Sequence, residues 1–222
     1  CLAGDLLPTN ITRNLIYKRG GAGHSLPRFA EVKNVKNVDI LFLGSSHTYR
    51  GFDTRIFYNN GFTSFNLGSS AQTPIQTQVL LDRYLAPLNP KIAIYEVYPI
   101  TFTLDGIEAA MDLISNDQND FASLKMAFHY NHIKAYNALI YSSYRQFFYK
   151  KNIVARDLKI GNDQYVSGGF VEKIRSEFKP KPFKKQELIF KENQLTILKR
   201  NIETLKKQGT KVYLVQAPIT SD

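Results

Sequence analysis

Two adjacent serines follow a short apolar run, and their surroundings suit nucleophilic chemistry. The run Val38–Leu43 ends in Gly44-Ser45-Ser46-His47. In an open parallel sheet, ligands bind beyond the carboxyl ends of the strands, so a turn of small residues at this point is well placed for catalysis. Gly44 permits a sharp turn, and a serine at a helix N-terminus has backbone N–H groups and the helix dipole beside it to stabilise an oxyanion. The alternative is that Gly-Ser-Ser only caps the next helix.

A second turn of small residues follows the next predicted strand. Asn66–Thr73 (NLGSSAQT) runs directly into a predicted helix at Pro74. Because both turns would lie at the same edge of the sheet, we expect them to face each other across one crevice. One turn would supply a nucleophile and the other backbone N–H donors.

These two segments resemble the first two sequence blocks of the SGNH (GDSL-like) hydrolase superfamily, which are Gly-Asp-Ser-x and Asn-x-Gly-x-x-Gly-x-Thr. The continuation Arg50-Gly51-Phe52-Asp53 is similar to the envelope branch of polysaccharide O-acyltransferases and O-acetylesterases. The resemblance covers residues 38–99, and residues 186–217 by topology only. It implies a flavodoxin-like three-layer α/β/α fold. It also implies a serine esterase or O-acyltransferase, acting without cofactor or metal on acetylated or otherwise acylated cell-envelope carbohydrate or another small ester.

Eight positions are candidates for the site, some from the resemblance and others from their place beside the two turns. Ser46 takes the nucleophile position, and the oxyanion would be held by backbone N–H groups of Ser46, Ala71 and Gly68. The candidates for lining the pocket are Ser45, His47, Asn66, Glu96 and Thr101.

The sequence departs from the family pattern at four places. Ser45 replaces the aspartate of the first block, and Ala71 stands where a glycine belongs, so the backbone there must tolerate a Cβ. Glu96–Thr101 (EVYPIT) replaces the Gly-x-Asn-Asp block, which leaves Thr101 as the only substitute for the asparagine donor.

The fourth departure is the absence of the Asp-x-x-His block, which carries the catalytic acid and base. A serine hydroxyl is a poor nucleophile without a base in hydrogen-bond reach. We therefore expect a C-terminally truncated domain, without the fifth strand and the His-bearing loop, that is itself inactive. The alternative is a non-catalytic glycan-binding module on the same fold. The crevice and the basic second half of the chain, from Tyr144 onward, would then bind an anionic glycan.

The remaining titratable residues give weaker signals. Adjacent side chains on a helix point about 100° apart, so His47 is a poor base for Ser46 but could line the pocket. A buried unpaired carboxylate is costly, so Glu96 either faces the crevice or pairs with a cation such as Arg50.

His129 and His132 have metal-ligand spacing but no third ligand, which favours packing or solvent exposure. His24 has no assigned role. Asp105, Glu108 and Asp112 fit a solvated helix face.

The elements that must position the two turns form a β-α-β-α-β pattern. The pattern predicts a doubly wound parallel sheet. The expected strands are Val38–Leu43, Phe62–Leu67, Lys91–Val97 and Lys211–Ala217, and the expected helices are Asp53–Tyr58, Pro74–Leu88 and Gln186–Gln208, the last capped by Gly209.

We expect a single domain of residues 1–222, with a core of residues 38–103 and 186–222. Two segments of this domain lie outside the β-α-β-α-β pattern. Residues 1–37 form a loop-like N-terminal extension. Residues 104–185 form a helical insertion or lid, with a loose region around Gly168-Gly169 and Lys179–Pro182. One helical stretch, Asp120–Tyr149, carries aromatic residues that favour a packing face over sugar stacking: Phe128, Tyr130, Tyr136, Tyr141, Tyr144, Phe147, Phe148 and Tyr149.

The composition is that of a globular protein with an uneven charge. The 222 residues are 43% hydrophobic, and a single cysteine excludes a disulfide framework and CxxC-type zinc or redox sites. No apolar run reaches the roughly 18 residues that span a bilayer. Of the net charge of +10, +9 falls from Tyr144 onward, especially in Lys173–Lys211. No nucleic-acid motif accompanies this excess, so a solvated lysine-rich surface is favoured over a nucleic-acid partner.

Cys1 gives the chain the appearance of a mature bacterial lipoprotein. A start after a membrane segment would look the same. Either origin predicts a bacterial cell-envelope location, periplasmic or on the outer surface, with a membrane tether at or before Cys1.

Overall fold

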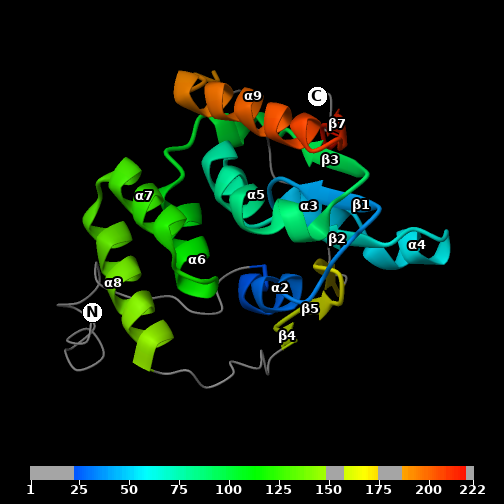
Figure 1. The fold of residues 1–222 in the computed structure, drawn as a ribbon, viewed down its shortest axis with the longest axis horizontal. Helices are drawn as coiled ribbons and strands as arrows, with labels where there is room; N and C mark the ends of the chain where they lie inside the picture. Colours follow the sequence, from blue (N-terminus) through cyan, green and yellow to red (C-terminus); the bar gives the residue numbers. More distant parts are fainter. Residues whose placement is uncertain (1–22, 149–157, 175–186, 219–222) are drawn as a thin grey trace.

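A four-stranded, all-parallel sheet forms the centre of the computed structural model, which describes residues 23–148, 158–174 and 187–218 (Figure 1). The strand order is β2-β1-β3-β7. The strands are β1 (Ile40–Leu43), β2 (Ser64–Asn66), β3 (Ile92–Glu96) and β7 (Lys211–Val215). All four predicted strands are present, each within its predicted bounds. The chain is thus a mixed α/β protein, and the carboxyl ends of β1, β2 and β3 meet at one edge.

Helices α5 (Pro74–Leu88) and α9 (Glu192–Lys207) pack against each other on one face of this sheet (Figure 1). Helix α5 has the predicted bounds because Thr73 and Gln76 form a capping box and Pro74 occupies the first turn. Helix α9 begins later than predicted, at Glu192, and ends before Gly209, which has a φ of 89°. Asn201 Nδ2 links α9 to this face by donating to the Tyr95 hydroxyl at 3.3 Å.

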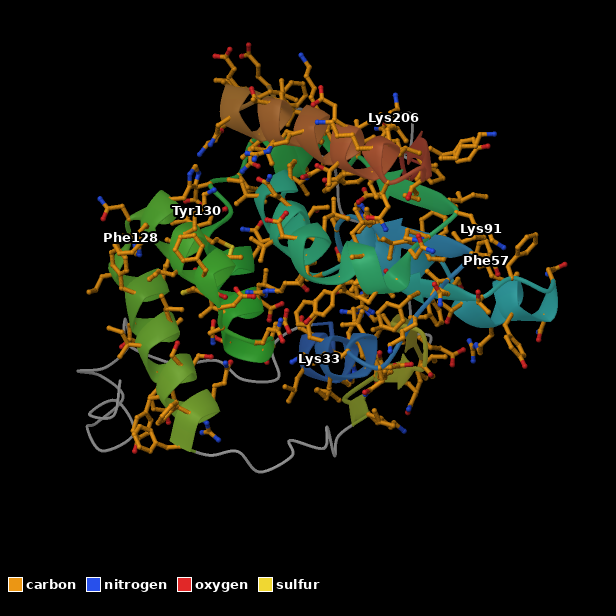
Figure 2. All side chains as sticks on the ribbon, in the orientation of Figure 1. Lys33, Phe57, Lys91, Phe128, Tyr130 and Lys206 are labelled. Atoms are coloured by element: carbon orange, nitrogen blue, oxygen red, sulfur yellow. The ribbon has the colours of Figure 1, made fainter. Side chains whose placement is uncertain are left out.

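The short helices α3 (Ser46–Gly51) and α4 (Thr54–Asn59) connect β1 to β2. Phe42 of β1 points to the face opposite α5, where its ring stacks on Phe52 at 4.7 Å and meets Phe57 edge-on at 4.9 Å. Figure 2 labels Phe57 where α4 adjoins the sheet. Aromatic packing therefore fixes this connection, which carries the first small-residue turn.

The N-terminal extension is not a loop throughout, contrary to the prediction from the sequence. Helix α2 (Ser25–Val32) lies within it, and its Phe29 and Val32 are buried in the main core. Pro27 falls in the first turn of α2, where a proline costs no intrahelical hydrogen bond. The Gly-rich sequence before it thus marks the start of a helix that is part of the core.

The predicted insertion contains more regular structure than the sequence indicated. The 3₁₀ turn η2 (Pro99–Phe102) precedes it, and its first helix is α6 (Ile107–Asn116). The single predicted helix Asp120–Tyr149 is in fact two helices, α7 (Phe121–Tyr130) and α8 (Ile133–Phe148). Asn131 separates them because its φ of 43° is left-handed, which ends α7. Tyr149 lies outside the described residues.

Two side-chain predictions for the insertion are wrong. Asp112 is only partly exposed and does not lie on a solvated face, because it accepts a hydrogen bond from the Ser25 hydroxyl of α2 at 2.5 Å. Its partial burial raises its pKa to about 6. The aromatic run is not one packing face, because Tyr141 is buried whereas Phe128, Phe147 and Phe148 are 61–73% exposed.

A small antiparallel sheet replaces the loose region expected around Gly168. Its strands are β4 (Lys159–Ile160), β5 (Asp163–Val166) and β6 (Phe170–Lys173). Gly168 and Gly169 form its β5–β6 turn with φ angles near 90°, and the Gly168 carbonyl accepts the Asn66 N–H at 2.7 Å. The turn therefore covers part of the outer edge of β2. Lys179–Pro182 lies outside the described residues.

No helix in the described part of the chain is long and apolar enough to cross a membrane.

Candidate functional site

The two small-residue turns meet at the carboxyl edge of the sheet, as predicted. The Ser69 N–H donates to the Gly44 carbonyl at 3.2 Å, so the turn after β2 is bonded directly to the turn after β1. Gly68 allows this approach, because a Cβ at that position would lie 2.8 Å from the Thr48 Cβ. The two turns predicted to face each other are thus gathered in one place.

Ser45 and Gly44 shape the start of α3. Ser45 is the N-cap residue: its hydroxyl accepts the His47 N–H at 3.3 Å, and its carbonyl accepts the Thr48 N–H. Gly44 has a φ of +138°, and a Cβ there would lie 2.5 Å from Thr48 Oγ1 and 2.7 Å from Glu96 Oε2. Only glycine fits this position, because both the backbone angle and the space exclude a side chain.

Glu96 is the buried carboxylate of the site, with 4% of its surface exposed. Its Oε2 accepts the Ser45 N–H at 2.9 Å and lies 3.5 Å from the Thr48 hydroxyl, and its Oε1 lies 3.4 Å from His47 Nδ1. Of the two alternatives for Glu96, pairing with Arg50 is wrong. Arg50 instead forms a two-pronged ion pair with Asp163 at 2.9 and 2.7 Å, which lowers the pKa of that carboxyl.

His47 is held through one ring nitrogen. Nδ1 lies between Glu96 Oε1 and the Ser45 hydroxyl, at 3.4 and 3.5 Å, and the ring meets Tyr98 edge-on at 4.3 Å. A proton on Nδ1 can be donated to the carboxylate, which leaves a lone pair on Nε2. The side chain is 40% exposed, so the imidazole is both oriented and accessible.

Ser46 is the first residue of α3 and is partly exposed. Among the described residues, neither its N–H nor its hydroxyl has a hydrogen-bond partner. The N–H of the exposed Ala71 is likewise unpaired within the described segments, because it donates to no acceptor there. Ala71 has a φ of 51°, so it adopts the left-handed conformation that a glycine would adopt without strain.

The other three candidates support the framework. Gly68 donates its N–H to Asn66 Oδ1 at 3.0 Å, so this group is not free to bind an oxyanion. Asn66 is fully buried, and its Nδ2 donates to the Thr48 carbonyl at 2.9 Å. Thr101 donates its hydroxyl to the Tyr98 carbonyl at 2.6 Å, within its own 3₁₀ turn, rather than to the crevice.

Tyr49 is a site neighbour that no sequence pattern singles out. Its hydroxyl lies 3.0 Å from the Ser70 hydroxyl in the second turn. Two guanidinium groups lie over its ring, that of Arg28 at 4.7 Å and that of Arg50 at 5.3 Å from the ring centroid. Arg28 is fully buried, and burial lowers its pKa. Only the fold brings these groups together, because Arg28 and Ser70 belong to separate elements.

His129 and His132 lie apart from the site, whereas His24 lies near Arg28 and Arg50. His129 contacts Tyr130, and His132 Nδ1 accepts the Lys134 N–H at 3.1 Å. His24 is buried, and burial lowers its pKa. No group of three or more His, Cys, Asp or Glu side chains in the described ranges could hold a metal ion.

No family model, no curated protein and no solved structure matches the chain. The resemblance to SGNH hydrolases therefore stays a prediction that rests on the two sequence blocks and their placement.

Proposed function

We propose that the chain is a serine-dependent ester hydrolase or O-acyltransferase of the SGNH type, on a flavodoxin-like three-layer fold. The observation that carries the proposal is the contact between Glu96 and His47 beside Ser46. One buried carboxylate holds both the backbone of the first turn and the imidazole, at 2.9 and 3.4 Å. Such a carboxylate–imidazole pair orients a general base and stabilises its protonated form. In this proposal the base is His47, whereas the sequence pattern pointed to an Asp-x-x-His block that is not found within residues 1–222.

The reaction begins at the Ser46 hydroxyl. Its oxygen attacks the acyl carbonyl, and its proton passes to His47 Nε2. A bridging water carries this proton, because neighbouring helix side chains diverge by about 100°. The N–H groups of Ser46 and Ala71 donate to the oxyanion, assisted by the first turn of α3. The imidazolium then returns the proton to the leaving alcohol as the ester C–O bond breaks.

The acyl group leaves Ser46 in a second step. A water molecule or an acceptor hydroxyl attacks the acyl carbonyl while Nε2 removes its proton. The bond between the acyl carbon and Ser46 Oγ then breaks, and the serine oxygen regains a proton from the imidazolium. Water gives hydrolysis, and a sugar hydroxyl gives transfer. The acylated envelope carbohydrate as substrate and the envelope location are parts of this proposal that rest on the family resemblance alone.

A fluorophosphonate probe tests the nucleophile. We expect it to label the wild-type protein and the Ser143→Ala control, whose serine is exposed on α8, but not Ser46→Ala. His47→Ala should slow labelling by roughly 10²-fold or more, because the general base is removed. Labelling of a different serine, or an unchanged rate in His47→Ala, would contradict the proposal.

One observation favours the second candidate, a non-catalytic glycan-binding module: the Ser46 hydroxyl has no partner among the described residues. The same experiment separates the two. A folded protein that binds an anionic glycan but is never labelled supports the binding module.

A further inference from the structure

The Tyr49 hydroxyl connects the helix of the candidate nucleophile to the turn that carries the second oxyanion donor. Tyr49 lies on α3, three residues after Ser46, and its hydroxyl oxygen is 3.0 Å from the Ser70 hydroxyl oxygen. Ser70 directly precedes Ala71, so the Ala71 N–H belongs to the peptide group that joins these two residues. The contact thus ties α3 to the peptide that bears this N–H.

The second turn needs such an anchor. Within the turn, the Gln72 N–H donates to the Ser69 carbonyl at 3.3 Å, which fixes the shape of the turn but not its place on α3. The bond from the Ser69 N–H to the Gly44 carbonyl lies before Ser70. Ala71 is exposed and has a left-handed φ of 51°, a conformation that persists only where neighbouring contacts hold it. The contact of Ser70 with Tyr49 is one that can hold it.

The surroundings of Tyr49 leave its hydroxyl little room to move. The side chain is buried, with 2% of its surface exposed. The Arg28 and Arg50 guanidinium groups lie over its ring, at 4.7 and 5.3 Å from the ring centroid. The Gly23 backbone lies against the hydroxyl, because a Cβ at this glycine would be 2.4 Å from the Tyr49 oxygen. The phenol is therefore held from several elements at once.

Arg28 is the costliest of these neighbours. Its side chain is fully buried, and its Nε donates to the Gly169 carbonyl at 3.1 Å. Its Nη1 and Nη2 have no hydrogen-bond partner in the described part of the chain. Buried donors without partners cost free energy, and a cation over an aromatic face recovers part of that cost. A role in holding Tyr49 in place accounts for a guanidinium kept at this position.

We infer that Tyr49 is a positioning residue for the proposed acyl transfer. Its hydroxyl holds the peptide between Ser70 and Ala71 against α3 and thereby sets the separation of the Ser46 and Ala71 N–H donors. Oxyanion donors stabilise a transition state only when they are aimed at the place where the charge develops. The inference rests on the proposed function, because the two N–H groups act as a pair only in that chemistry.

Tyr49→Phe tests the inference, because it removes the hydroxyl and keeps the ring beside both guanidinium groups. We expect the maximal rate of fluorophosphonate labelling at Ser46 to fall roughly tenfold, less than the 10²–10³-fold lost when an oxyanion donor is removed outright. The half-saturating probe concentration should not change, since the hydroxyl acts through the turn. Ser70→Ala should have the same effect. The double variant should be no slower than the slower single variant, because both changes remove one shared contact.

The matched control is Tyr165→Phe. Tyr165 packs in the same small cluster as Tyr49 and donates its hydroxyl to Glu31 Oε2 at 2.6 Å, so this variant also loses a buried hydrogen bond. Its hydroxyl does not reach the second turn, and the variant should be labelled at the wild-type rate. Thermal unfolding shows whether each variant is folded.

Hydrogen exchange gives a readout that needs no chemistry at Ser46. The Ser69 and Gln72 N–H groups of the second turn are hydrogen-bonded in the structure. They should exchange faster in Tyr49→Phe than in the wild-type protein, because a turn that is less firmly held opens more often. In Tyr165→Phe they should exchange at the wild-type rate.

Three results distinguish this inference from the proposed function. Wild-type labelling and exchange in folded Tyr49→Phe would overturn the inference and leave the proposed function standing. Equal slowing in Tyr165→Phe would also overturn it, because the loss would then reflect a general loosening of the cluster. A wild-type protein that is never labelled overturns the proposed function and, with it, the pairing of the two donors, while faster exchange in Tyr49→Phe still supports the anchoring of the turn.

Discussion

The Glu96 carboxylate accepts a hydrogen bond from the Ser45 backbone N–H at 2.9 Å, joining the end of β3 to the first turn after β1. Both residues are nearly inaccessible to solvent. A buried N–H without a partner costs free energy, so this contact fixes the backbone that presents Ser46. The same carboxylate reaches His47, and the shape of the turn is thereby linked to the orientation of the imidazole.

Substitutions of Glu96 should separate these two roles. Glu96→Gln keeps an oxygen for the Ser45 N–H and should cost less than about 1 kcal/mol in unfolding free energy, whereas Glu96→Ala leaves that N–H unpaired and should cost about 1–3 kcal/mol. Both should slow fluorophosphonate labelling, because neither gives His47 a carboxylate. Chemical denaturation and labelling rates measure the two effects. Equal stability of the two variants would show that the backbone contact is unimportant.

Alanine should be tolerated less well at position 44 than at position 61, where Gly61 also has a positive φ. Gly44→Ala places a Cβ 2.5 Å from Thr48 Oγ1 and adds the cost of a disfavoured φ. Gly61 has a φ of +83° and open space around the position that a Cβ would take, so Gly61→Ala reports the backbone cost alone, about 1–2 kcal/mol. Unfolding free energies of both variants give the comparison. We expect Gly44→Ala to exceed Gly61→Ala by about 1 kcal/mol or more, the cost of overpacking, and to lose labelling of Ser46.

The sheet and its main helices were predictable because each is encoded locally. The run Ile40–Leu43 is apolar throughout, as a strand buried on both faces must be. Thr73-Pro74 and Gln76 mark the start of α5 within a few residues. Parallel pairing then follows from the alternation of strands and helices, and with it the meeting of the two turns at one edge.

The contacts that define the site were not predictable, because they join distant segments. His47 and Glu96 are 49 residues apart, and Arg50 and Asp163 are 113 apart. Each pair depends on side-chain directions that no local pattern encodes. Helix α2 was missed for a different reason: its short sequence follows a glycine cluster and contains Pro27, and burial of Phe29 in the core decides its conformation.

The protein should become more stable when Ala71 is replaced by glycine. Its φ of 51° is left-handed, which costs an alanine about 1–2 kcal/mol. Glycine removes that strain but loses more conformational entropy on folding, by about 0.4–1 kcal/mol. We therefore expect the Ala71→Gly protein to be more stable than the wild-type protein by up to about 1.5 kcal/mol, and to keep the N–H donor and the labelling of Ser46. The control Ala86→Gly, on the exposed side of α5, should instead be destabilised by about 1 kcal/mol. The same sign for both variants would contradict the strain at Ala71.

Asp112 should make the protein less stable as the pH rises from about 4 to about 6. Burial raises its pKa to about 6 from an ordinary value of 3.8, so the folded state holds its proton more tightly than the unfolded state does. The stability that this carboxyl contributes is therefore fully present below pH 3.8, the ordinary pKa. It is lost as the pH rises through the pKa of the folded state, about 6. The whole loss amounts to at most about 3 kcal/mol.

Asp112→Asn removes the ionisation and keeps an oxygen that can accept the Ser25 hydroxyl. The variant should therefore lose this part of the pH dependence and be more stable than the wild-type protein near neutral pH. The control Glu108→Gln changes an exposed carboxylate on the same helix and should shift stability by less than about 1 kcal/mol at any pH. Denaturant unfolding across this pH range measures all three proteins. If Asp112→Asn and the wild-type protein follow parallel curves, Asp112 does not retain its proton above its ordinary pKa in the folded state.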